Sequence, residues 1–177
     1  YNPFKGIIIE NVTLYDTTNK VIAHFDQFVG NISYRRLLKK EVAIKDLYLE
    51  GPLFYLTTDA NHKTNLQFLA DAFPAQEPAH IGDWVFSVRS IHINNGTFYY
   101  NHLPAPYGAK GAFNPLHLCI SNLQTSLSLE VLSADTAHLT LHTLSLQEKC
   151  GFKLKDLSCQ ASVGSKASTI RDFALKL

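Results

Sequence analysis

A six-residue motif recurs along this chain and constrains how the chain can fold. The motif is apolar-x-x-apolar-x-apolar, as in Ile44-Lys45-Asp46-Leu47-Tyr48-Leu49, and its two middle residues are polar. Six copies begin at Ile9, Ile44, Val88, Leu141, Leu154 and Ile170, and a looser copy spans Ile120 to Thr125.

The motif predicts a bulged β-strand. Side chains alternate between the two faces of a strand, so an apolar-x-x-apolar step would move the second apolar residue to the opposite face. One inserted residue restores the phase and adds twist or bend. Repeated along the chain, the motif favours a long, curved, bulged and largely antiparallel sheet with one apolar face, and such repeats are typical of elongated arrays. The alternative is that any all-β chain matches three apolar positions by chance.

The remaining pattern places strands and short helices around these motifs. We expect strands at 7–15, 21–34, 42–49, 53–56, 84–93 and 97–100, with a hairpin turn at Asn94-Asn95-Gly96. Residues 34–40 fit one or two helical turns. Thr64 or Asn65 can cap a second helix, whose stripe of Leu66, Leu69, Ala70 and Phe73 ends at Pro74.

We treat residues 1–177 as a single elongated unit. Residues 74–83 have the composition of a linker or loop, and the Pro- and Gly-containing stretch at 103–115 is a second possible sub-boundary. From Leu116 onward, leucine alternates with Ser, Thr and His, which predicts strands with one apolar face and one uncharged polar face. A second sheet could cover that apolar face, as in a sandwich, or the sheet could bend over itself and leave an apolar trough.

Composition excludes some classes of function. The net charge is +1, and no basic stripe interleaved with aromatic residues points to nucleic acid. No apolar run reaches the ~18 residues that cross a bilayer. The chain has no Met and begins at Tyr1 within a strand pattern, so we expect it to be a piece of a longer protein. Cys119, Cys150 and Cys159 are expected to be free thiols, with a Cys150–Cys159 disulfide across a hairpin as the alternative.

The sequence carries no pattern of catalytic or metal-binding residues. His138 and His142 share a face, yet no third ligand is spaced to complete a metal site. His92 and His102 flank the expected hairpin without a neighbouring nucleophile, and no phosphate-binding glycine loop occurs. We therefore expect no enzymatic activity, no cofactor and no bound metal.

Residues 4–73 resemble the N-terminal portion of AsmA-like proteins, most closely the TamB branch of the translocation and assembly module. The matching stretches are Val12 to Asp16, Leu37 to Leu56 and Asp59 to Leu69, with Asn65-Leu66 in the place of the family's Asn-Leu. The chain departs from the family pattern at the last turn, where Asn61 and His62 stand instead of a glycine.

The resemblance implies a sheet curled into an apolar groove in an inner-membrane-anchored protein of the Gram-negative periplasm. Such proteins are associated with cell-envelope biogenesis, through lipid transport to the outer membrane or assembly and secretion of outer-membrane proteins. The implied partners are phospholipid acyl chains or outer-membrane protein strands, with an outer-membrane barrel as a further possible partner. The membrane anchor is expected outside these residues.

The apolar positions of the motifs are the candidate lipid-contacting residues. If the motifs line a common interior, it contains Ile44, Leu47, Leu49, Val88, Ile91, Ile93, Leu141, Leu144 and Leu146; ordinary core packing is the alternative for each. The rival function is an extracellular β-sandwich module that binds a glycan or a protein through Tyr99, Tyr100 and Tyr107. A second rival is strand addition, in which a sheet edge pairs with a segment of an outer-membrane protein.

Overall fold

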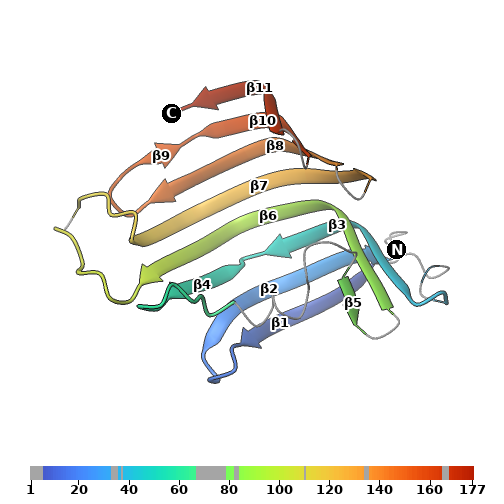
Figure 1. The fold of residues 1–177 in the computed structure, drawn as a ribbon, viewed down its shortest axis with the longest axis horizontal. Helices are drawn as coiled ribbons and strands as arrows, with labels where there is room; N and C mark the ends of the chain where they lie inside the picture. The colour runs from blue at the N-terminus through green and yellow to red at the C-terminus, as the bar shows by residue number, and fades with distance from the viewer. Residues whose placement is uncertain are drawn as a thin grey trace.

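The protein folds as a single curved β-sheet (Figure 1). The computed structural model describes residues 6–32, 36, 38–66, 79–81, 84–109, 111–133, 136–164 and 168–177. Their strands are β1 (Ile7–Tyr15), β2 (Val21–Ile32), β3 (Glu41–Glu50), β4 (Leu53–Thr58), β5 (Ala79–Ile81), β6 (Trp84–His102), β7 (His117–Ser133), β8 (Thr136–Glu148), β9 (Lys153–Leu154), β10 (Asp156–Gly164) and β11 (Ser168–Lys176).

The sheet is mixed, and its order is β1-β2-β3-β6-β7-β8-β10-β11. β4 continues the line of β3, and both pair in parallel with the long strand β6. All other pairings are antiparallel. The mainly β, bulged, curved and largely antiparallel fold predicted from the sequence is therefore confirmed. β5 pairs with β6, and β6 pairs with β7, so the strands on either side of residues 103–115 belong to one sheet.

Bulges lie inside the six-residue motifs, as their spacing predicts. Register shifts by one residue fall within the copies on β3, β7, β8 and β11. The third motif residue has a left-handed backbone at Asn11 (φ 54°), Asn122 (φ 51°) and Asp172 (φ 51°). Asn and Asp tolerate positive φ better than other non-glycine residues, which explains their use at this position.

A row of these irregular residues crosses one half of the sheet, and we call it the kink line. Asn11 lies opposite Asp26, Asp26 lies beside Gly51, and Gly51 and Pro52 lie beside Asn95 and Gly96. Asn95 on β6 and Asn122 on β7 produce two opposite register shifts that compensate each other. Because neighbouring strands each accommodate the extra residue, the ladder resumes in register on both sides, with Gly51 N donating to Asn94 O at 3.0 Å and Thr97 N to Pro52 O at 2.7 Å.

The prediction of a hairpin turn at Asn94-Asn95-Gly96 was wrong. β6 runs continuously from Trp84 to His102, so His92 and His102 lie on one strand. Asn95 does have φ 54°, but this conformation forms a bulge beside the break at Gly51-Pro52. The residues Ile93 to Phe98 are in effect another copy of the motif, hidden because Gly96 takes the fourth position.

Other expected elements also differ from the fold. The alternative of a hairpin between Cys150 and Cys159 was wrong, because β9 and β10 follow one another along β8. All three cysteines are free thiols, as expected. Residues 79–81 of the expected linker form β5. Thr64 forms a bridge to Thr58, and the side chain of Asn65 bonds to β4. The helix that either residue was expected to cap, with its stripe at 69–73, lies outside the described residues. Of the turns expected at 34–40, residues 38–40 form a turn, and 34, 35 and 37 lie outside the described residues.

Three sharp turns share one design that the sequence analysis did not detect. They span Asp16 to Lys20, Asp59 to Lys63 and Glu148 to Phe152. In each, an acidic residue accepts backbone N–H groups within the turn, and the fourth residue has positive φ: Asn19 (64°), His62 (59°) and Gly151 (102°). The carboxylate satisfies donors that the tight chain reversal would leave without a partner.

We expect Gly51→Ala to destabilise the fold more than Gly111→Ala. Both glycines have positive φ, at 57° and 83°, where a Cβ costs about 1–2 kcal/mol. An added Cβ at Gly51 would also collide with the Asp26 carboxylate, whereas nothing lies within 4 Å at Gly111. Urea denaturation measures the difference, and equal losses in the two variants would contradict the kink-line packing.

Acid should weaken the turn at Glu148. Burial disfavours the charged carboxylate, but hydrogen bonds from Cys150, Cys119 and Lys149 outweigh it and hold the Glu148 pKa below its usual 4.5. A lowered folded-state pKa gives stability that is present above pH 4.5 and is lost as the pH falls through the folded pKa. Glu148→Gln should therefore cost about 1 kcal/mol at pH 7.

Denaturation of both proteins at pH 7 and at pH 3 checks this expectation. The gap between wild type and Glu148→Gln should narrow at the lower pH. A gap that stays constant would show that the charge of Glu148 contributes nothing to the turn.

Candidate functional site

A cluster of apolar side chains on one face of the sheet is the main candidate site. Its buried centre is Ala23, Phe25, Leu47 and Leu49. The partly buried residues packed around this centre are Val12, Phe28, Ile44, Phe54, Val88, Ile91 and Ile93. Phe25 and Phe54 meet edge to face, with ring centroids 5.6 Å apart. Six of the nine predicted lipid-contacting residues therefore lie in one cluster.

Two copies of the motif form the centre of this cluster by pairing side by side. β3 and β6 run parallel in perfect motif register, with Ile44 opposite Val88, Leu47 opposite Ile91 and Leu49 opposite Ile93. Directly paired residues share a face of the sheet. Equivalent apolar positions of the two copies therefore stack across the strands.

The other three predicted residues continue the same face toward the C-terminus. Leu47 pairs with Ile91, Ile91 with Leu127, and Leu127 with Leu141. In the next row, Ile93 pairs with Thr125 and Thr125 with Leu144. Leu146 pairs with the buried Leu154. We call this continuous surface the apolar face; its lining of a groove stays a prediction.

The bulge on β8 shows how the apolar face is kept in phase. The register shift falls at His142, between the pairs Leu127–Leu141 and Ser126–Thr143. His142 bonds the Ser128 hydroxyl (2.7 Å), and Thr143 donates to Asp156 Oδ1 (3.0 Å). Both middle residues of the motif are thus exposed and hydrogen-bonded to polar partners, while Leu141 and Leu144 are half-buried on the apolar face.

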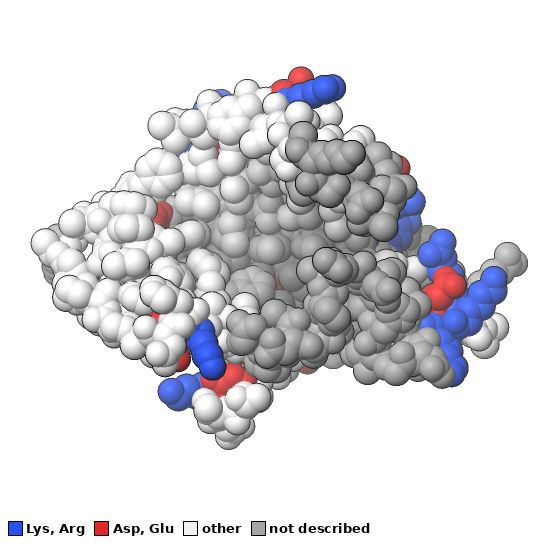
Figure 2. All heavy atoms as spheres, in the orientation of Figure 1, with Lys and Arg blue, Asp and Glu red and all other residues white. Residues whose placement is uncertain are grey.

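The opposite face is polar and aromatic. Tyr48 stacks on His92 (4.5 Å between centroids), and His92 bonds the Ser126 hydroxyl (3.0 Å). Tyr55 stacks on Tyr99 at 5.0 Å. In Figure 2, the Lys, Arg, Asp and Glu side chains of the described residues lie mainly at the margin of the visible surface. The row Tyr48–His92–Ser126 lies between the apolar rows Leu47–Ile91 and Leu49–Ile93, so its side chains point to the opposite face and the sheet is two-sided.

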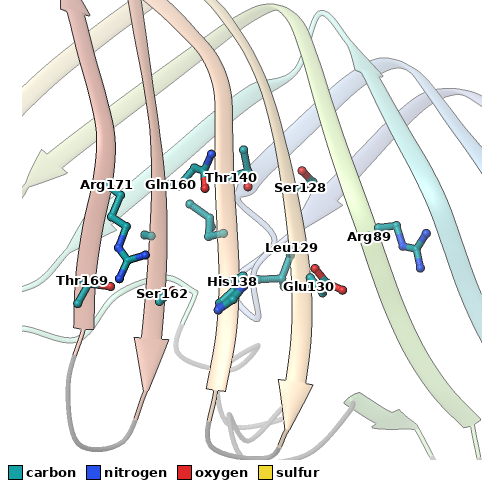
Figure 3. Close-up of a pocket in the computed structure, with 12 residues that line it drawn as sticks. Arg89, Ser128, Leu129, Glu130, His138, Thr140, Gln160, Ser162, Thr169 and Arg171 are labelled. Carbon is teal, nitrogen blue, oxygen red and sulfur yellow. The ribbon is translucent and has the colours of Figure 1, made fainter.

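A polar hollow of about 530 Å³ crosses the C-terminal strands (Figure 3). Its side chains include Arg89, Glu130, His138, Gln160 and Arg171. Arg171 reaches from β11 toward β10, whereas Arg89 lies beyond β7 and points away from the others. Four strand spacings separate β6 from β11, roughly 19 Å along the sheet. Arg89 and Arg171 are therefore too far apart to bind the same charged group of a ligand.

Within the described residues, no three His, Cys, Asp or Glu side chains gather as a metal site, and no helix could span a bilayer. The tyrosines expected for a binding module are dispersed: Tyr99 stacks on Tyr55, and the exposed Tyr107 stacks on His117. A sandwich needs two sheets, and the described strands form one.

Comparison with known proteins adds no relative. The chain matches no family model, and no curated protein or solved structure is significantly similar to it.

Replacing two leucines by alanine, one at a time, should distinguish a core residue from an accessible residue of the apolar face by the loss of stability. Leu47 is buried at the centre of the cluster (9% exposed), so Leu47→Ala should cost about 2–4 kcal/mol. Leu144 is half-buried on the same face, so Leu144→Ala should cost about 1 kcal/mol. Urea denaturation measures both, and an equal loss would mean that Leu144 is also core.

Proposed function

We propose that the apolar face of this sheet shields phospholipid acyl chains while lipids move between the inner and outer membranes of a cell envelope. The observation that carries the proposal is the continuity of the apolar face, from Val12 on β1 to Leu141 on β8, in a chain whose described residues form one sheet. Many of its side chains remain only half-buried, so they can contact a bound molecule.

The energetics favour an extended apolar surface over a single pocket. Each CH₂ removed from water contributes roughly 0.8 kcal/mol, so a pair of acyl chains needs contact along its whole length. A row of aliphatic side chains supplies this contact without direction or charge. Binding and release then require no covalent step.

The local geometry of the turn at Asp59 supports the resemblance to AsmA-like proteins. The family has glycine where His62 stands, and His62 has φ 59°, a conformation that favours glycine. The side chain of Asn65 accepts from Thr57 N (3.0 Å) and donates to Tyr55 O (2.8 Å), which ties the end of the turn to β4. We accordingly propose that the lipid route lies in the periplasm, in a protein tethered to the inner membrane, as the resemblance implies.

Assembly of outer-membrane proteins is the second candidate function. It would use the sheet edge instead of the apolar face, because an incoming strand pairs with backbone groups. The exposure of all nine residues of the edge strand β11 favours it.

Two paired substitutions on β8 test the lipid proposal. Leu141→Arg with Leu144→Arg places charge on the apolar face, and His138→Arg with His142→Arg places the same charge on exposed positions of the opposite face. We expect the first variant to lose about tenfold or more of the bound phospholipid, because an unpaired charge opposes burial of acyl chains. The second variant should bind like wild type.

The readout is lipid extracted from purified protein and identified by mass spectrometry, with circular dichroism as the check that the sheet forms. Equal lipid in the two variants, or none in the wild type, would overturn the proposal. If both variants still bind an unfolded outer-membrane protein in the absence of lipid, the result favours the second candidate.

A further inference from the structure

The two edge strands of the sheet, β1 and β11, carry the same motif and are exposed. β11 contains Ile170, Phe173 and Leu175 at the apolar motif positions, exposed by 68%, 62% and 52%. β1 contains Ile9, Val12 and Leu14 at the same positions, with Ile9 47% and Leu14 43% exposed. Among the described residues, each of these strands has a paired neighbour on one side only. A long, apolar, exposed edge is a template for pairing with another strand.

The direction of the two edges is compatible with head-to-tail pairing. Along the path from β1 to β11, every step is antiparallel except β3 to β6, and the number of reversals is even. β1 and β11 therefore point the same way, as their arrows show in Figure 1. A second copy placed beyond β11 in the same orientation would present its β1 in parallel.

The sheet already contains the pairing that such a contact would form. β3 and β6 are parallel, and their motifs align position by position. The same alignment between copies would set Ile170 beside Ile9, Phe173 beside Val12 and Leu175 beside Leu14. It would also set Asp172 beside Asn11, which share the left-handed backbone of the bulge.

Charge favours this alignment as well. The second motif position is Arg171 on β11 and Glu10 on β1, and both are exposed on the polar face. Glu10 accepts a 3.3 Å hydrogen bond from Gln27 on the neighbouring strand β2, and its carboxylate is exposed to solvent. Opposite charges directly across two strands stabilise the pair, and like charges destabilise it.

We infer that β11 of one copy pairs in parallel with β1 of a second copy of this chain, with the six-residue motifs in register. The contact is heterologous, because different strands meet, so each added copy leaves a free β11 edge for the next. The apolar face then continues from copy to copy.

Reciprocal charge reversal tests this contact. Arg171→Glu and Glu10→Arg each replace the opposite-charge pair by a like-charge pair, so each should weaken self-association by about 2- to 30-fold. An equimolar mixture of the two variants should regain association, because Glu at 171 then faces Arg at 10. Arg89→Glu, at the second motif position of the interior strand β6, is the matched control and should associate like wild type.

Analytical ultracentrifugation over a wide range of protein concentration gives the readout. Concentration-dependent growth of the wild type, its loss in each single variant and its recovery in the mixture support the contact. Three outcomes would overturn the contact: a wild type that stays monomeric, single variants that associate unchanged, or a mixture that does not recover association. The edge strand would then be free to pair with a different polypeptide. These results are read without lipid, so they are separate from the fate of the acyl-chain proposal.

Discussion

The fold depends on keeping apolar side chains on the same face of each strand, although two polar residues repeatedly stand between them. A strict alternation gives no place for two consecutive polar residues between apolar ones. Asn11, Asn122 and Asp172 resolve this conflict with a left-handed backbone at the third motif position. On β8 the same correction appears as a register shift at His142. The continuity of the apolar face across β1, β7, β8 and β11 follows from these local insertions.

The turns apply a related solution at the ends of strands. Each combines an acidic side chain that gathers backbone N–H groups with a left-handed fourth residue. The hydrogen bonds from Lys20 and Thr18 lower the pKa of Asp16, so its carboxylate stays charged where the turn needs an acceptor. Tight chain reversal and bulging thus use the same backbone conformation, which explains the high count of Asn, Asp and Gly at these positions.

The sequence predicted the strands and the common apolar face because both depend on local periodicity. The sequence-based prediction failed where a segment could form either a turn or a strand and the neighbouring strands decided between them. Asn94-Asn95-Gly96 has the composition of a hairpin turn, yet the neighbouring Gly51-Pro52 break lets β6 pass straight through. The stretch from Cys150 to Cys159 resembles a hairpin, yet β8 is long enough to pair with both of its halves. The parallel match of β3 with β6 could not be foreseen, because it joins residues far apart in the chain.

That parallel junction has a consequence for how the chain acquires its fold. β1 with β2, and β7 with β8, are antiparallel neighbours joined by short connections, so they can form early and locally. β6 meets β3 only across a wide separation in the chain, such as the 44 positions from Glu50 to Asn94. Closing so long a loop costs entropy before any contact repays it. We therefore expect the pairing of β6 with β3 to form more slowly than the local antiparallel hairpins, and until it forms the edges of β3 and β6 are open to solvent.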